Sequence, residues 1–216
     1  MLNRALVAEF VGTFALVFVG AAAGALGIGL LGIALAHGLV VLAIISAYGR
    51  VSGAHINPAV TIALWSARQI DATRTVAYIA AQLTGGLTAG LALAFVLGGA
   101  ESGLGTTLLA DSVDPVRGLL LEALLTFFLV NSFMNTALGE HATQRTGIAV
   151  GGTLVFCMLA GAPLTGASLN PARTLGPAVA TGRFDDLWLY FVGPILGGLA
   201  AAFLFTGLLR DDADTR

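Results

Sequence analysis

Two copies of one polar signature stand out in a chain that is otherwise mostly apolar. The first reads Gly-Ala-His-Ile-Asn-Pro-Ala-Val over residues 53–60, and the second reads Gly-Ala-Ser-Leu-Asn-Pro-Ala-Arg over residues 166–173. Asn is a favoured N-cap and Pro a favoured first helical residue, so each Asn-Pro-Ala triplet begins a helix abruptly. A helix N-terminus carries partial positive charge, and an asparagine amide donates hydrogen bonds. These residues are therefore suited to orienting a small polar molecule and repelling cations.

Arg173 closes the second signature and is the most informative charge in the chain. An arginine at membrane depth costs roughly 2.5–3.5 kcal/mol on insertion scales, so a residue of this kind normally has a function. The predicted polar site contains Asn57, Pro58, Ala59, Asn170, Pro171, Ala172 and Arg173.

The two signatures belong to a longer internal repeat. They are 113 residues apart, and the same offset maps Glu9 onto Glu122 and Gly85 onto Gly198. The sequence therefore predicts a duplicated unit with no net gap between its halves.

The composition indicates a protein that crosses a membrane several times. Hydrophobic residues make up 57% of the 216 residues, charged residues 10%, and the mean hydropathy is +0.91. A soluble domain has about 25% charged residues. The net charge of −2 and the lack of a basic run argue against a nucleic-acid partner. One cysteine, three histidines and no clustered carboxylates leave little material for a metal centre or an acid–base pair, so we expect no enzyme activity.

The apolar runs predict an all-α membrane protein with six transmembrane helices and two re-entrant half-helices. A span needs about 20 apolar residues, and the candidate spans are residues 5–27, 32–50, 75–98, 117–138, 147–164 and 187–209. The half-helices are predicted over residues 57–68 and 170–181, because these segments are too apolar for ordinary loops and too short to cross the membrane. We expect the first span to be retained rather than cleaved as a signal, since its apolar run continues past residue 25.

An odd number of spans in each half makes the repeat an inverted one. The first repeat is predicted over residues 1–113 and the second over residues 114–216, and together they form one pore-forming domain. Non-helical backbone at membrane depth survives only where it is buried in protein or lines a water-filled cavity. Two half-helices that enter from opposite faces therefore predict a cavity where their N-termini meet.

The arginines set the expected orientation. Seven fall on one side of the predicted membrane and three on the other: Arg4, Arg50, Arg68, Arg74, Arg145, Arg210 and Arg216 against Arg117, Arg173 and Arg183. The positive-inside rule then makes both termini cytoplasmic. All ten basic residues are arginine, a bias typical of a GC-rich bacterial genome, and we expect a plasma-membrane location in the inner membrane of a bacterium.

The paired Asn-Pro-Ala triplets, the arginine after the second, and the opening Ala-Glu-Phe-Val-Gly-Thr-Phe over residues 8–14 resemble the aquaporin, or major intrinsic protein, family. The resemblance covers essentially the whole chain. It implies a helical bundle with one pore per subunit, assembly as a homotetramer in the lipid bilayer, and no cofactor. It also implies that Glu9 and Glu122 are structural residues that accept hydrogen bonds from the re-entrant loops.

Family spacing places the selectivity filter at His37, Met158, Ala167 and Arg173. Strict water channels of the family usually have Phe, His, a small residue and Arg, and glycerol channels usually have Trp, Gly, Phe and Arg, so this chain departs from both. His37 with Met158 is more similar to plant tonoplast members, which pass ammonia or urea besides water. Thr174 stands where glycerol channels typically have Asp. We therefore expect water as the main permeant, with small neutral solutes as further permeants.

Several alternatives remain open from the sequence. The channel could chiefly pass glycerol, urea, ammonia or a metalloid hydroxide. Inverted repeats with broken helices also occur in secondary transporters, although these normally have ion-coupling acids at the midplane. A membrane hydrolase would need a Ser/His or paired-Asp constellation, which we do not find. Cys157 precedes Met158 and could face either the pore or lipid.

Overall fold

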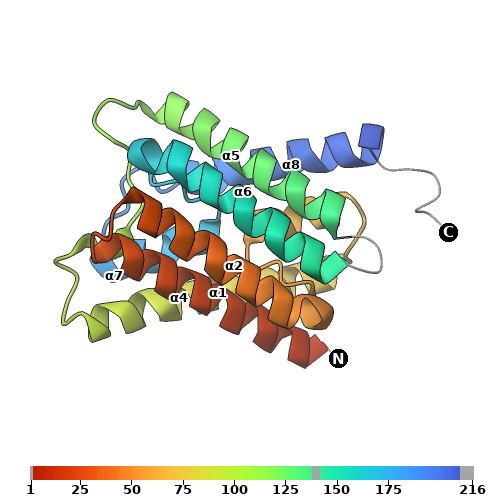
Figure 1. The fold of residues 1–216 in the computed structure, drawn as a ribbon, viewed down its shortest axis with the longest axis horizontal. Coiled ribbons are helices and arrows are strands. Elements are labelled where there is room, and N and C mark those ends of the chain that lie inside the picture. Colours follow the sequence, from red (N-terminus) through yellow and green to blue (C-terminus); the bar gives the residue numbers. More distant parts are fainter. Residues whose placement is uncertain (1, 138–141, 210–216) are drawn as a thin grey trace.

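The computed structural model describes residues 2–137 and 142–209, and these residues form helices and loops without a strand (Figure 1). The six long helices are α1 (Leu2–Ala25), α2 (Leu30–Ser52), α4 (Ala72–Val96), α5 (Pro115–Thr136), α6 (Ala142–Thr165) and α8 (Leu189–Leu204), the last continued by a π-helical turn, η2 (Phe205–Leu209). The two short helices are α3 (Pro58–Ser66) and α7 (Pro171–Thr181). A 3₁₀ turn, η1 (Gly103–Gly105), lies in the loop between α4 and α5.

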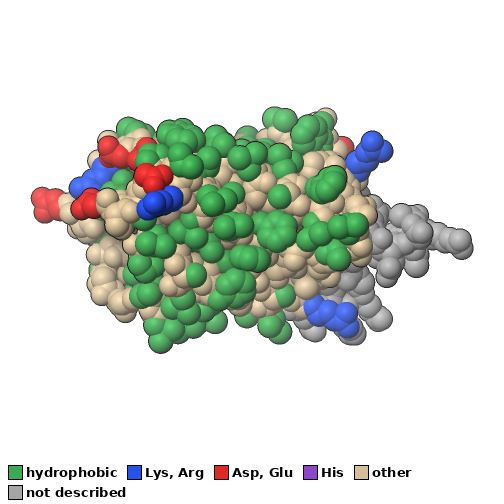
Figure 2. Space-filling model, turned by 90° about the horizontal axis from the view of Figure 1, so that it is seen from above, with side chains coloured by type: hydrophobic (Ala, Val, Ile, Leu, Met, Phe, Trp, Pro, Cys, Tyr) green, Lys and Arg blue, Asp and Glu red, His purple; other side chains and the backbone are tan. Residues whose placement is uncertain are grey.

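The predicted fold class is confirmed. Among the residues that the structure describes, six helices are long and apolar enough to cross a membrane, and each overlaps one predicted span. The half-helices also begin at the expected asparagines, although α3 ends two residues before the predicted residue 68. Hydrophobic side chains cover the middle of the face in Figure 2, whereas the charged side chains of that face gather near its two ends. This distribution suits a helical bundle surrounded by lipid.

The two halves of the chain interlock. Helices α1, α2 and α4 form one group of spans and α5, α6 and α8 the other, with α2 packed against α6 between them. Each half-helix packs against the last span of the opposite half, α3 on α8 and α7 on α4. The start of α1 and the end of α8 lie at one end of the bundle, which we call the terminal end, and the opposite end is the distal end (Figure 1).

Glycines allow these helices to approach closely. A methyl group at Gly86 of α4 would overlap the carbonyl oxygen of Ala172 in α7, and one at Gly198 of α8 would lie 3.0 Å from the carbonyl oxygen of Ala59 in α3. Helix association in lipid depends on close van der Waals packing, because lipid tails supply no hydrophobic driving force. These small residues therefore hold each half-helix against the opposite half.

The same contacts correct the predicted pairing of Gly85 with Gly198. Gly85 faces the carbonyl of Phe10, and the residue that faces the equivalent Ala123 is Gly197. The offset is therefore 112 rather than 113 in the last span of each half, because one residue fewer separates the second signature from its span. The prediction of a repeat without any gap was wrong by this one residue.

The arginine distribution is also corrected at one position. Arg173 is only 4% exposed and lies inside the bundle, so it is not a flanking charge. Arg210 and Arg216 lie outside the described residues.

Substituting Gly86 by Ala should destabilise the bundle, because the added methyl overlaps the backbone of α7. We expect a loss of about 1–3 kcal/mol, typical of overpacking, measured as a lower thermal transition in detergent. Gly152→Ala is the matched control, since Gly152 is exposed and its added methyl meets no atom within 4 Å. Equal stability of the two variants would contradict the close approach of α4 and α7.

Candidate pore

The N-termini of the two half-helices face each other inside the bundle. The side-chain oxygen of Asn57 accepts from the N–H of Ala59 at 2.8 Å, and that of Asn170 accepts from the N–H of Ala172 at 2.9 Å. These are N-cap bonds, as the sequence predicts. Pro58 and Pro171 are the first residues of α3 and α7.

The asparagine amide nitrogens cross from one half of the chain to the other. Asn57 Nδ2 donates to the carbonyl of Leu169 at 2.8 Å, and Asn170 Nδ2 donates to the carbonyl of Ile56 at 2.9 Å. An amide nitrogen has two hydrogens. Each asparagine can therefore tie the two signatures together and still offer one hydrogen to a molecule in the cavity.

Glu9 holds the first signature from behind. Its Oε1 accepts from the Ser52 hydroxyl at 2.6 Å and from the N–H of His55 at 3.0 Å, and its Oε2 accepts from the N–H of Ile56 at 2.7 Å. Gln82 Nε2 adds a fourth bond, at 2.8 Å from Oε2. The carboxylate thus accepts hydrogen bonds from two consecutive backbone N–H groups, those of His55 and Ile56, which lie in a loop and have no helical partner.

Glu122 holds the second signature in the same way. It accepts from the hydroxyl of Thr165 at 2.7 Å, from the N–H of Ser168 at 2.9 Å and from the N–H of Leu169 at 2.8 Å. No described residue takes the place of Gln82 here. Both glutamates are fully buried.

The signature loops have an unusual backbone that matches between the two halves. Positive φ angles occur at Ala54 (50°) and Ile56 (45°), and at Ala167 (46°) and Leu169 (54°). Such angles are uncommon outside glycine and unfavourable for a β-branched residue. They turn successive N–H groups toward each glutamate, so the carbonyls of the same peptide planes point away from it.

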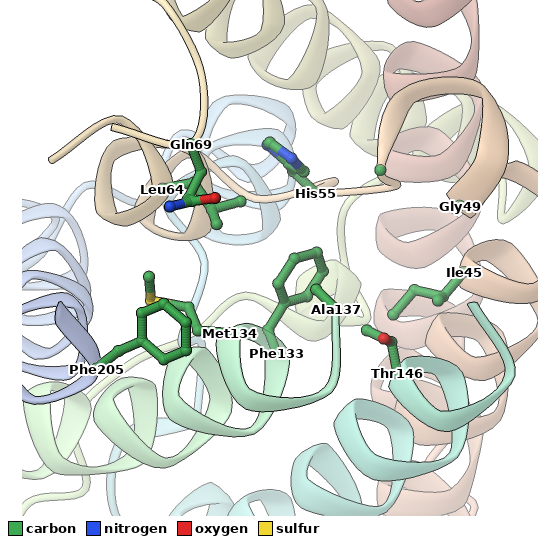
Figure 3. Close-up of a pocket in the computed structure, with 11 residues that line it drawn as sticks. Ile45, Gly49, His55, Leu64, Gln69, Phe133, Met134, Ala137, Thr146 and Phe205 are labelled. Atoms are coloured by element: carbon green, nitrogen blue, oxygen red, sulfur yellow. The ribbon is translucent and has the colours of Figure 1, made fainter. Parts of the chain in front are cut away.

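Three cavities that share lining residues lie along these loops. At the terminal end, a cavity of about 220 Å³ is lined by residues that include His55, Gln69 and Phe133 (Figure 3). A narrow central cavity of about 30 Å³ shares His55 and Phe133 with it. A distal cavity of about 320 Å³ shares Arg173 with the central one. The central cavity has room for only about one or two water molecules at a time.

The lining of the central cavity follows the internal repeat. Fourteen of its residues form seven pairs at the 113-residue offset. These pairs are Leu16 with Leu129, His37 with Val150, Val41 with Leu154, His55 with Ser168, Ile56 with Leu169, Asn57 with Asn170, and Val60 with Arg173. Most of these side chains are apolar, so a passing molecule meets few hydrogen-bonding partners.

Three of the four predicted filter residues line the cavities toward the distal end, whereas Ala167 lines none of the three. His37 and Arg173 line the central cavity, Met158 and Arg173 line the distal one, and Ala167 is buried within the second signature loop. His37 Nδ1 bonds to the carbonyl of Ile33 at 2.9 Å. Arg173 Nη1 donates to the carbonyl of Gly105 at 2.7 Å, and its buried Nε has no partner among the described residues.

Three residues that sequence reasoning did not assign to the pore, Ile45, His55 and Phe133, line both the central and terminal cavities. The rings of His55 and Phe133 are 5.8 Å apart, centroid to centroid, in an edge-to-face arrangement. The hydroxyl oxygen of Thr61 lies 3.2 Å from His55 Nδ1, within hydrogen-bond distance. His55 could have been found from the sequence, because it and its counterpart Ser168 both lie within the repeated signature. Phe133 could not, because it lies outside the signatures and its counterpart at the 113-residue offset is Gly20.

Cys157 faces neither the pore nor lipid. Its side chain is fully buried between α6 and α5, with Sγ 3.6 Å from the carbonyl oxygen of Leu125. Thr174 has a structural role, because its hydroxyl is hydrogen-bonded to the hydroxyls of Thr107 and Ser168.

Comparison with known proteins identifies the family. The family model described as major intrinsic protein matches residues 1–205. The chain belongs to the major intrinsic protein family. It is therefore a membrane channel and not an enzyme, and the predicted family resemblance is confirmed.

The relatives of this major intrinsic protein include channels with different names. Aquaporin TIP4-4 of Zea mays is 41% identical to it, over 98% of this chain and 92% of the relative. Glycerol uptake facilitator protein-like 6 of Lactiplantibacillus plantarum is 40% identical, over 93% of this chain and 95% of the relative. The X-ray structure of the aquaglyceroporin from Plasmodium falciparum aligns with a TM-score of 0.86 over 97% of each chain, at 24% identity, and shows the common fold alone.

Glu122→Gln should weaken the second signature, because an amide replaces one of the oxygens that accept from Thr165, Ser168 and Leu169. Leaving one of these buried donors unpaired costs about 1–3 kcal/mol, so we expect a lower thermal transition in detergent and reduced channel activity. Glu101→Gln makes the same chemical change at an exposed loop residue and serves as control. A Glu122→Gln variant as stable as this control would contradict the bracing role.

The burial of Cys157 predicts that mercuric ions do not block the channel. The thiol lies outside the residues that line the three cavities, so a bound mercury atom would not stand in the path. Osmotic flux should be the same before and after mercurial treatment, with the Cys157→Ser variant as reference. Rapid inhibition that Cys157→Ser abolishes would contradict this placement.

Proposed function

We propose that the protein is a passive water channel that excludes protons and other ions. The observation that supports this most directly is the central cavity, with room for one or two water molecules between the amides of Asn57 and Asn170. Its mostly apolar wall offers a water molecule few competing partners. A water molecule that enters gives up hydrogen bonds to bulk water, and the amides of Asn57 and Asn170 replace part of them as it passes in single file.

The asparagine amides support the exclusion of proton transfer. Each can donate one hydrogen to the oxygen of a passing water, which turns the hydrogens of that water away from the midplane. The N-termini of α3 and α7 point at the same place, and each carries roughly half a positive charge. At about 5 Å and an effective dielectric near 20, each end opposes a cation by about 1.7 kcal/mol.

Arg173 supports cation exclusion at the distal end. A fixed positive charge about 4 Å from the path opposes another cation by about 4 kcal/mol at an effective dielectric of 20, which is on the order of a thousandfold discrimination. We assign Arg173, His37, Met158 and Ala167 to the selectivity filter. The contact of Arg173 with Gly105 fixes the guanidinium beside the cavity.

The proposed arrangement in the cell rests on the arginine distribution for its orientation, on the all-arginine usage for a bacterial source and on the family for the number of subunits. We assign the terminal end to the cytoplasm and the membrane to the plasma membrane of a bacterium, with four subunits each forming its own pore. The two inverted repeats, residues 1–113 and 114–216, act as one pore-forming domain.

A second candidate function is the conduction of small neutral solutes such as glycerol, urea, ammonia or metalloid hydroxides. Met158 favours this candidate, since a flexible thioether side chain lines the distal cavity where a bulkier rigid ring would restrict it. The likeness to a glycerol uptake facilitator-like protein supports it as well. A secondary transporter is disfavoured, because the amides, helix N-termini and arginine at the cavity repel the cations that usually drive coupled transport.

Stopped-flow light scattering on proteoliposomes tests the proposal. We expect fast osmotic water flux that is linear in the gradient, has a low activation energy, and exceeds glycerol and urea uptake. Empty liposomes provide the baseline. Slow water movement with rapid solute entry would replace the water assignment by the solute channel, and saturable, ion-dependent flux would replace both by a transporter.

Arg173→Val should increase cation leakage, because valine is the residue at the equivalent position 60 and carries no charge. Loss of a barrier of about 4 kcal/mol permits up to a thousandfold rise in cation entry, and we expect at least a tenfold rise. A pH-sensitive dye inside proteoliposomes measures the leak, relative to water flux in the same preparation. Unchanged leakage would contradict the filter role of Arg173.

A further inference from the structure

A glycine beneath the filter histidine has no role in the pore described so far. Gly20 lies in α1, is buried, and faces the ring of His37 in α2. A methyl group at residue 20 would overlap Nε2 and would lie 2.6 Å from Cδ2 and 2.8 Å from Cε1 of that ring. The imidazole therefore occupies the space that a side chain at residue 20 would fill.

The hydrogen bonds of His37 explain why the ring stays there. The carbonyl of Ile33 can only accept, so the Nδ1 atom 2.9 Å away carries the hydrogen. Nε2 is buried against Gly20 and has no partner among the described residues. One bond to its own helix and the notch in α1 thus fix the ring at the edge of the central cavity, with 2% of its surface exposed.

In the second half of the chain, the large and small side chains at these two positions are exchanged. The residue equivalent to Gly20 is Phe133, and the residue equivalent to His37 is Val150. Phe133 and Val150 both line the central cavity. In the first half the large ring comes from the second span and a glycine of the first span makes room for it, whereas in the second half the large ring belongs to the first span and the second span carries a smaller valine.

We infer that Gly20 is a positioning residue for the filter, and that the Gly20–His37 pair sets the width of the distal constriction. This rests on the proposed pore function of the cavity. Relief of the overlap with an added methyl group requires the ring to move by about 1 Å to reach van der Waals distance. Arg173 lines the same cavity, so a ring displaced from α1 moves into a space with room for only about one or two water molecules.

The experiment compares four full-length channels in proteoliposomes: wild type, Gly20→Ala, His37→Ala and the double variant. We expect Gly20→Ala to lower water permeability at least about fivefold, because the displaced ring would occupy part of a cavity of about 30 Å³. In the His37→Ala background, where no ring remains to be displaced, the same substitution should change permeability by less than about twofold. Gly152→Ala is the control for adding a methyl within a helix.

The possible outcomes separate the positioning role from simple helix packing. If Gly20→Ala leaves flux unchanged, or lowers it equally with and without His37, the inference is overturned. If Gly20→Ala does not reconstitute but the double variant does, the overlap with the ring is supported; if neither reconstitutes, it is contradicted. If the wild type passes a solute instead of water, the proposed function fails, and the same four-way comparison with that solute still tests the Gly20–His37 pair.

Discussion

The reciprocal bonds between the two signatures are the constraint on which the rest of the structure depends. Asn57 and Asn170 each cap their own half-helix and bond to the backbone of the opposite loop. These bonds hold two helix N-termini at one point in the interior. The backbone conformations that allow this cost of order 1–3 kcal/mol per strained residue, and the carboxylates of Glu9 and Glu122 offset the cost by satisfying the displaced N–H groups.

Close helix packing supplies the frame that keeps these loops in place. Each half-helix lies against the last span of the other half, at contacts where Gly86 and Gly198 bring backbones together. Because neither half can complete its own half-helix packing, the loops are positioned only when both halves are folded. The pore is thus a property of the interface between the repeats rather than of either repeat.

Duplication lets one backbone present two different linings. The pairs at the 113-residue offset share a position on the wall, yet Arg173 replaces Val60 and His37 replaces Val150. At the distal end the cavity is therefore polar and charged, while near the terminal end it is narrowed by the rings of His55 and Phe133. The backbone bonds that shape the loops are the same at both ends, so these side chains could differ without loss of the fold.

The sequence by itself determined the six spans, the two half-helices and the residues at their N-termini, because each depends on local chemistry: apolar length, a capping asparagine and a first-turn proline. The internal offset also identified Glu9 and Glu122 as a matched pair. Only the tertiary structure decided which surfaces meet. It showed that the last spans align at an offset of 112, that Cys157 faces a neighbouring helix, that Phe133 reaches the cavity, and that Gly20 makes room for His37. A helical period gives the direction of a side chain relative to its own helix, whereas its neighbour depends on the crossing of two helices and on single missing methyl groups, and neither is encoded in a local pattern.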